Sequence, residues 1–258
     1  MNIIKSKKTY TVFFTILLIC AGILFYKPPE SNYLIQNYQY SAPANKAFID
    51  DNFYKCIVDN YNRINKTNIA YTDNLTDEQL QTITKLDCFG YDKLDDEKIV
   101  NVDGLEKLVN ITILDIRFNN ITELVVSKNI KLEALYDNDN HLNKLNIGTN
   151  DVLITLQAYN NQLTKVDLSK IKNLKSLMIG NNQLPSLDVS KNIALSYLDL
   201  NNNKLTEIDI SNNTDLKTLN ISYNNIELID LSKNNVLSFV EANNNKLTQI
   251  DVTKNTKL

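Results

Sequence analysis

Residues 195–215 read LSYLDLNNNKLTEIDISNNTD, and this 21-residue unit decides the fold. Its leucines, together with Asn203, follow the spacing L-x-x-L-x-L-x-x-N-x-L. Leu198 and Leu200 are two residues apart, which is the period of a short strand whose alternate side chains face inward. The unit therefore predicts one short strand followed by a turn.

The same unit occurs seven times between residues 111 and 258, with no insertion or deletion. The units open on Ile111, Leu132, Leu153, Leu174, Leu195, Leu216 and Leu237, and Leu258 opens an eighth. Eight positions later stand Asn119, Asn140, Asn161, Asn182, Asn203, Asn224 and Asn245. A fixed period near twenty indicates a solenoid in which each coil packs on its neighbours. We expect the asparagines to form a buried structural ladder that satisfies backbone groups in the turns.

The second half of each unit repeats the spacing of the first half. In residues 205–213, LTEIDISNN again places apolar residues at the first, fourth and sixth positions and asparagine at the ninth. A unit of 21 residues has no room for a long helix on the convex side, so we expect extended segments and turns there. The concave side is predicted to be one parallel sheet. Its strands should centre on Leu114, Leu135, Leu156, Leu177, Leu198, Leu219 and Val240.

These units resemble leucine-rich repeat proteins, and in particular the 21-residue type of the internalin branch. The resemblance rests on the seven units, on DVSKN at 188–192 and DLSKN at 230–234, and on a preceding cap. It implies a surface protein of the adhesin kind. Internalin J, which defines the 21-residue type, has a cysteine ladder that this chain lacks. The corresponding column reads Ile116, Asp137, Ala158, Ile179, Leu200, Ile221 and Ala242.

A helical cap is expected over residues 46–82, ahead of an irregular first repeat at 83–110. Terminal coils need such a cap because their apolar ends are otherwise exposed. Asp50 is a candidate N-cap for the first helix, and Thr76 and Gln79 have the spacing of a capping box for the second. The seven regular repeats then occupy 111–258 and are expected to continue beyond residue 258, since Leu258 opens a new unit.

The first 26 residues are predicted to be a targeting segment. Lysines precede an uncharged stretch from Thr9 to Tyr26, whose length is at the short end of what spans a bilayer. We expect an uncleaved signal anchor with the N-terminus inside and the repeats on the extracellular face of the membrane. Lipidation at Cys20, or cleavage and secretion, are the alternatives. Residues 27–45, which contain three prolines, are predicted to be a polar tether.

Three buried positions carry unusual chemistry. Cys56 lies on the apolar face of the first predicted helix, and Cys88 points inward from the first strand. An exported protein could join them in a disulfide, or they could remain two buried thiols. Asp137 stands where other units bury an apolar residue, so we expect either local distortion or burial with hydrogen bonds and a raised pKa.

The composition excludes several function classes. The net charge is −3 and arginine occurs twice, so the basic stripe expected of a nucleic-acid-binding protein is absent. There is one histidine, His141, and there are no metal-spaced Cys/His clusters or glycine-rich loops. A column of aspartates at 167, 188, 209, 230 and 251 is expected to cap turns. We therefore predict no enzyme activity, no catalytic residues, no metal and no cofactor.

We expect a ligand to bind at the strand positions that face outward on the concave side. These positions carry aromatic, acidic and amide side chains, a mixture that suits a protein or glycan ligand. The candidate binding residues are Asp115, Arg117, Phe118, Tyr136, Tyr159, Tyr197, Asp199, Tyr223, Phe239 and Glu241. The alternative is a passive solenoid spacer that presents a C-terminal domain. A single aromatic patch would favour binding, and scattered aromatic residues would favour the spacer.

Overall fold

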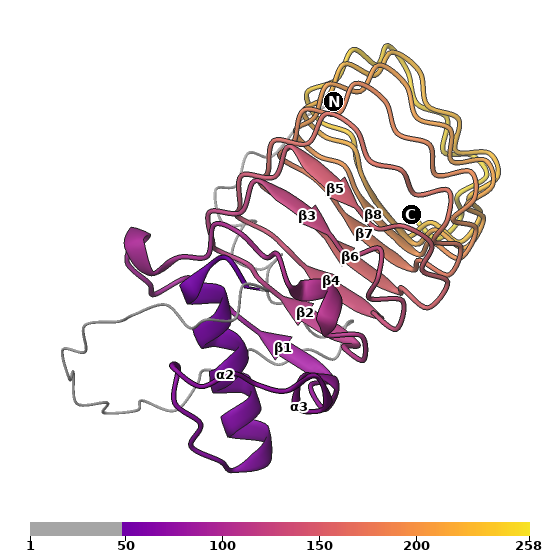
Figure 1. Ribbon diagram of the computed structural model, residues 1–258. Coiled ribbons are helices and arrows are strands. Elements are labelled where there is room, and N and C mark those ends of the chain that lie inside the picture. The colour runs from indigo at the N-terminus through magenta and orange to yellow at the C-terminus, as the bar shows by residue number, and fades with distance from the viewer. Residues whose placement is uncertain (1–47) are drawn as a thin grey trace. The chain divides into compact units, whose positions relative to one another are not determined.

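The computed structural model describes residues 48–258, which form a solenoid of stacked coils (Figure 1). One face of the solenoid is an eight-stranded parallel sheet in the order β1-β2-β4-β6-β7-β8-β9-β10. Its strands are β1 (Lys85–Asp87), β2 (Ile113–Asp115), β4 (Ala134–Tyr136), β6 (Thr155–Gln157), β7 (Ser176–Met178), β8 (Tyr197–Asp199), β9 (Thr218–Asn220) and β10 (Phe239–Glu241). The predicted fold class and the seven predicted strand centres are confirmed.

The register of the sheet follows the sequence period. From β2 onward each residue pairs with the residue 21 positions later, as Leu114 does with Leu135 and Leu198 with Leu219. The opposite side has one short parallel pair, β3 (Glu123–Val125) with β5 (Lys144–Asn146). Elsewhere on that side the chain turns, and residues 111–258 contain no helix.

The core is a continuous column of aliphatic side chains inside the coils. In the unit that opens at Leu195, the side chains of Leu198, Leu200 and Leu205 are fully buried. Each such leucine contributes roughly 1.5–3 kcal/mol by burial. Because the same positions recur in every coil, the column extends along the whole stack.

The predicted asparagine ladder lines the turns that follow the strands. Asn182 shows the pattern: its amide donates to the carbonyl oxygens of Ala158, Ile179 and Gly180 at 2.9, 3.1 and 3.1 Å. Its side-chain oxygen accepts from the backbone nitrogen of Leu163 at 2.9 Å. One side chain thus ties two consecutive coils together.

A second asparagine ladder lies on the opposite side of the coils and was not predicted as a ladder. Asn213 donates to the carbonyl oxygens of Val189 at 3.1 Å and Asn192 at 2.9 Å. Equivalent bonds are made by Asn129, Asn150, Asn192, Asn234 and Asn255. Both halves of the repeat are therefore closed by a buried amide, which explains why their spacings match.

The N-terminal cap consists of helices α2 (Asp51–Asn65) and α3 (Asp77–Gln81). Thr76 and Gln79 form the predicted capping box at the start of α3. Two 3-10 turns follow in the irregular first repeat, η1 (Asp95–Glu97) and η2 (Leu105–Lys107). The cap buries its apolar face on the first coil, as the fold requires.

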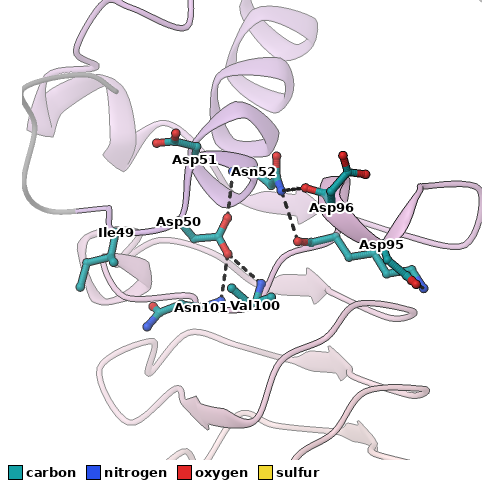
Figure 2. A pocket seen from close by; sticks show the side chains of 9 residues that line it. Ile49, Asp50, Asp51, Asn52, Asp95, Asp96, Val100 and Asn101 are labelled. Carbon is teal, nitrogen blue, oxygen red and sulfur yellow. Dashed lines mark hydrogen bonds and ion pairs between the residues drawn. The ribbon is translucent and has the colours of Figure 1, made fainter. Parts of the chain in front are cut away.

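Asp50 joins this cap to the solenoid (Figure 2). One carboxylate oxygen accepts from the backbone nitrogens of Asn52 and Phe53 at the start of α2, at 2.8 and 3.0 Å. The other accepts from the backbone nitrogens of Val100 and Asn101 in the first repeat, at 2.7 and 3.0 Å. The residue predicted as a helix cap therefore also fixes the first irregular loop.

A disulfide between Cys56 and Cys88 links α2 to the segment after β1, with alpha carbons 5.7 Å apart. The bridge closes a loop of 32 residues in sequence. In the chain-entropy description such a loop stabilises the fold by roughly 3–4 kcal/mol.

The predicted membrane location is not supported. Within residues 48–258, no helix is long and apolar enough to cross a membrane. The predicted anchor at Thr9–Tyr26, the tether and the lipidation candidate Cys20 lie outside the described residues. The single-pass location expected from the sequence is therefore withdrawn.

Candidate ligand-binding face

The candidate residues lie on the outer surface of the eight-stranded sheet and on the turns that follow its strands. Asp115 is in β2, Tyr136 in β4, Tyr197 and Asp199 in β8, and Phe239 and Glu241 in β10; Arg117, Phe118, Tyr159 and Tyr223 are in the following turns. All are half-buried except Tyr223, which is 50% exposed. The candidate side chains are therefore more buried than their predicted outward position suggested.

Arg117 contacts three other side chains at the N-terminal end of this face. Its Nη2 and Nε bond to the two carboxylate oxygens of Asp115 at 2.6 and 2.9 Å. Its guanidinium carbon lies 5.0 Å from the ring centre of Phe89 and 5.5 Å from that of Tyr136. Burial acts to lower the pKa of Arg117, but the bonds and charge of Asp115 raise it. The guanidinium is thus held charged and in a fixed plane.

An aromatic cluster adjoins Arg117, and two of its members were missed in the sequence. The ring centres of Phe89 and Tyr91 are 6.1 Å apart, and those of Phe118 lie 5.2 Å from Phe89 and 5.0 Å from Tyr91. Phe89 is 40% exposed and Tyr91 is 64% exposed. Both lie in the irregular first repeat, whose outer positions were not included in the concave columns. Phe89 follows β1 as Arg117 follows β2, and this equivalence could have identified the two residues from the sequence.

Acidic side chains cluster farther along the sheet. Burial, with a contribution from Glu241, raises the pKa of Asp199 to about 6. Burial also raises the pKa of Tyr197, and the charges of Asp199 and Glu241 add to the effect. This part of the face therefore becomes more negative as the pH rises through 6.

The four aromatic residues expected to mark one patch are distributed along the sheet. Tyr136 is on β4 and Tyr159 follows the neighbouring β6, whereas β7 separates these from Tyr197 on β8, and β9 separates Tyr197 from Phe239 on β10. Tyr159 accepts a hydrogen bond from the side-chain amide of Asn181 at 2.7 Å. The rings of Phe89, Tyr91 and Phe118 contact one another at the N-terminal end of the face.

The turn before each ladder asparagine adopts a left-handed conformation. Asp139, Asn160, Asn181, Asn202 and Asn244 occupy this position in five coils, with φ between 50° and 58°. Phe118 and Tyr223 occupy it in the other two, with φ of 59° and 57°. Asparagine and aspartate tolerate this region, whereas a bulky aromatic residue there is strained. Such strain is typical of positions that serve a function.

Residues 48–258 contain no group of three or more His, Cys, Asp or Glu side chains that could hold a metal ion. The aspartate column caps turns, as Asp167 and Asp188 do by accepting from the backbone nitrogens of Ser169 and Ser190 at 2.9 and 2.8 Å. His141 is exposed in the turn after β4. Solenoids of this type typically bind other molecules and are not enzymes.

Comparison with known proteins supports the leucine-rich repeat class of solenoid. Over 85 residues, 33% of this chain, the sequence is 35% identical to internalin J of Listeria monocytogenes serotype 4b (strain F2365). The chain has the leucine-rich repeat fold, and over this segment its sequence is similar to that of an internalin. The match spans 8% of the length of internalin J, and no family model matches the chain.

Two solved structures share the internalin-like fold. Internalin C2 of L. monocytogenes strain 4b F2365 superimposes with a TM-score of 0.69 at 20% identity, over 87% of this chain and 97% of that one. An internalin-like protein of L. monocytogenes gives 0.56 at 20% identity, over 81% and 65%. At this identity the two structures establish the fold of the chain alone.

Proposed function

We propose that this internalin-like chain is a binding protein that works outside the cell and holds a protein ligand against its concave sheet. One observation carries the proposal. Arg117 is fixed by two bonds to Asp115 and lies between the rings of Phe89 and Tyr136. Arginine and tyrosine are enriched among the few residues that carry most of the binding energy at protein interfaces. A side chain already held in place loses little entropy on binding, so this group is prepared for a partner.

The extent of the face supports a protein ligand over a small one. The ten candidate residues span strands β2 to β10, and neighbouring strands are about 4.8 Å apart. The candidate surface is therefore roughly 30 Å long. It mixes aromatic rings with carboxylates and amides, as protein interfaces of standard size do.

The disulfide supports a location outside the cytoplasm. Cys56 and Cys88 are bonded in the structure. Disulfides persist in secreted and cell-surface proteins and are rare in the reducing cytosol. An exported binding protein is consistent with both this bond and the partly exposed aromatic side chains of the face.

The test uses immobilised fibronectin, laminin and type IV collagen, together with fixed epithelial cells, as probes for the purified chain. We expect saturable binding to at least one probe. Arg117→Ala should weaken it about 30-fold, the equivalent of ~2 kcal/mol at a hot spot. Arg117→Lys should weaken it similarly, because lysine keeps the charge but cannot form the planar pair with Asp115.

The control is Lys170→Ala, an exposed residue on the side of the coils away from the sheet. This variant should bind as the parent does, and all variants should keep the parent melting temperature within a few degrees. Equal binding by Arg117→Ala and the parent would contradict the proposal.

The second candidate function is a passive spacer that presents another domain. It is favoured by the distribution of Tyr136, Tyr159, Tyr197 and Phe239 over separate strands. A spacer predicts that no substitution on the concave sheet changes binding to any probe. The Arg117 variants therefore discriminate the two functions.

A further inference from the structure

A groove of about 800 Å³ lies outside the concave sheet, along the turns that follow its first strands. Tyr91 and Phe118 line it in the first two coils, and Asn120, His141 and Gln162 line it in successive coils. The volume is within the range of ligand pockets, roughly 300–1,000 Å³. These turns are at the carboxyl ends of the strands, so the groove is separate from the strand positions that face a concave ligand.

The irregular first repeat forms one wall of the groove. This repeat runs from 83 to 110, which is seven residues longer than the regular unit. The longer loop contains η1, and Asp95 and Lys98 in it line the groove. The regular coils carry no equivalent insertion, so the wall stands only beside the first coils. The extra length of this repeat thus coincides with a built pocket.

A row of hydrogen-bonding side chains runs along the groove. Asn120, His141 and Gln162 are equivalent residues 21 positions apart, and their backbone nitrogens bond to the preceding coil at 2.9 Å in each case. Their backbones are therefore fixed at a spacing of about 4.8 Å. Within the described residues, no side-chain hydrogen bond engages any of the three. The row offers both donors and acceptors to a ligand.

An aromatic platform stands beside this row. Tyr91 is 64% exposed, and its ring meets that of Phe118 edge to face, with centres 5.0 Å apart and planes at 87°. Phe118 has a φ of 59°, a conformation that five other coils give to asparagine or aspartate. A strained, bulky residue thus supports an exposed ring at the groove.

The charges in the groove nearly cancel. Lys98 and Asp95 form an ion pair at 3.1 Å. Asp139, the other carboxylate of the lining, accepts from the side-chain amide of Asn160 at 2.6 Å. A groove with one paired lysine and a slight acidic excess does not favour an anionic ligand.

We propose that this groove binds a neutral oligosaccharide. Sugar rings present apolar C–H faces that stack on an aromatic ring, and their hydroxyl groups both donate and accept hydrogen bonds. Tyr91 provides the stacking surface, and Asn120, His141 and Gln162 bond to hydroxyls along the chain of sugars. The site shares Phe118 with the proposed protein-binding face, but its other residues lie outside that face and the proposal does not depend on it.

The experiment is a glycan array that carries neutral oligosaccharides of glucose, galactose, mannose and N-acetylglucosamine beside sialylated and sulfated ones. The full chain should bind one or more neutral oligosaccharides, and calorimetry with the best of them should give a saturable isotherm. Tyr91→Ala should weaken this binding about tenfold or more. Gln162→Ala should weaken it by a smaller factor.

Gln183→Ala is the matched control, because Gln183 occupies the equivalent position one coil beyond the groove. It should bind the oligosaccharide as the parent does, and so should the concave variant Tyr159→Ser/Tyr197→Ser. Binding of acidic glycans alone, no binding to any neutral glycan, or full binding by Tyr91→Ala would each overturn the proposal. Loss of saccharide binding in the concave variant would also overturn it, by placing the sugar on the sheet.

Discussion

Replacing Asp137 by leucine is expected to stabilise the solenoid by about 1–2 kcal/mol at pH 7. Asp137 is completely buried in a column that is apolar in every other regular coil. One carboxyl oxygen accepts from the side-chain amide of Asn140 at 2.8 Å, and the other has no partner within the described residues. An unpartnered buried polar atom costs roughly 1–3 kcal/mol.

The expected gain in the free energy of unfolding is the balance of opposing changes. Leucine buries an additional apolar side chain, worth roughly 1.5–3 kcal/mol, and removes the unpartnered oxygen. Asn140 loses one bond, worth about 1 kcal/mol, but keeps its bond to the carbonyl oxygen of Ile116 at 2.9 Å. The larger side chain has space because the neighbouring coil carries Ala158 in the same column. Crowding offsets a further part of the gain.

The gain should also depend on pH. Burial raises the pKa of Asp137 well above its ordinary 3.8, the Asn140 bond opposes this, and the charge of Asp115 adds to it. The folded chain then holds a proton that the unfolded chain has released. The contribution of Asp137 to stability is therefore fully present below 3.8 and is lost as the pH rises toward the folded pKa, by up to about 1.4 kcal/mol per unit.

The assay is urea unfolding followed by circular dichroism at pH 5, 6 and 7, for the parent, Asp137→Leu and Asp137→Asn. The advantage of leucine over the parent should increase with pH. Asp137→Asn, which keeps the shape but cannot titrate, should show a flatter pH dependence than the parent. A lower free energy of unfolding for Asp137→Leu at pH 7, or an advantage that is the same at all three pH values, would refute the reasoning.

Three further predictions concern stability. Reduction of the Cys56–Cys88 bridge should lower the free energy of unfolding by roughly 3–4 kcal/mol, measured by urea unfolding with and without dithiothreitol; coincident curves would contradict this. Asn182→Ala should cost about 2–4 kcal/mol in the same assay, because it leaves three carbonyl oxygens and the backbone nitrogen of Leu163 without their side-chain partner. Asp199, whose pKa is raised to about 6, should stabilise the chain less as the pH rises from 4 to 7. Carboxyl NMR should show the midpoint of its titration near pH 6. A midpoint at the ordinary value of an aspartate would disprove the burial argument.

The repeat pattern predicted the strands and the first asparagine ladder because each depends on residues within one coil and its neighbours. Leu198 and Asn203 lie where their spacing placed them, in the strand and in the turn after it. The helical cap followed from Asp50 and from the Thr76–Gln79 capping box, which are also local signals.

The sequence was less informative where contacts cross the irregular first repeat. The cluster of Phe89, Tyr91 and Phe118 forms because that repeat brings its outer residues beside the next coil, and no fixed period describes it. The concave aromatic residues were expected to face outward, yet Tyr197 is half-buried. The hydrogen bond that Asp50 accepts from the backbone nitrogen of Val100 joins residues 50 positions apart in the sequence. Local helix-capping signals do not predict such a contact.

The concave face is tested most directly by the affinity of Tyr159→Ser/Tyr197→Ser for the probe that the parent binds, measured by surface plasmon resonance. Both tyrosines are half-buried, so the variant is first required to unfold cooperatively in urea. The proposed protein-binding function predicts a loss of at least about 30-fold, with Lys170→Ala unchanged. Affinity equal to that of the parent would contradict it and would leave the solenoid as a spacer.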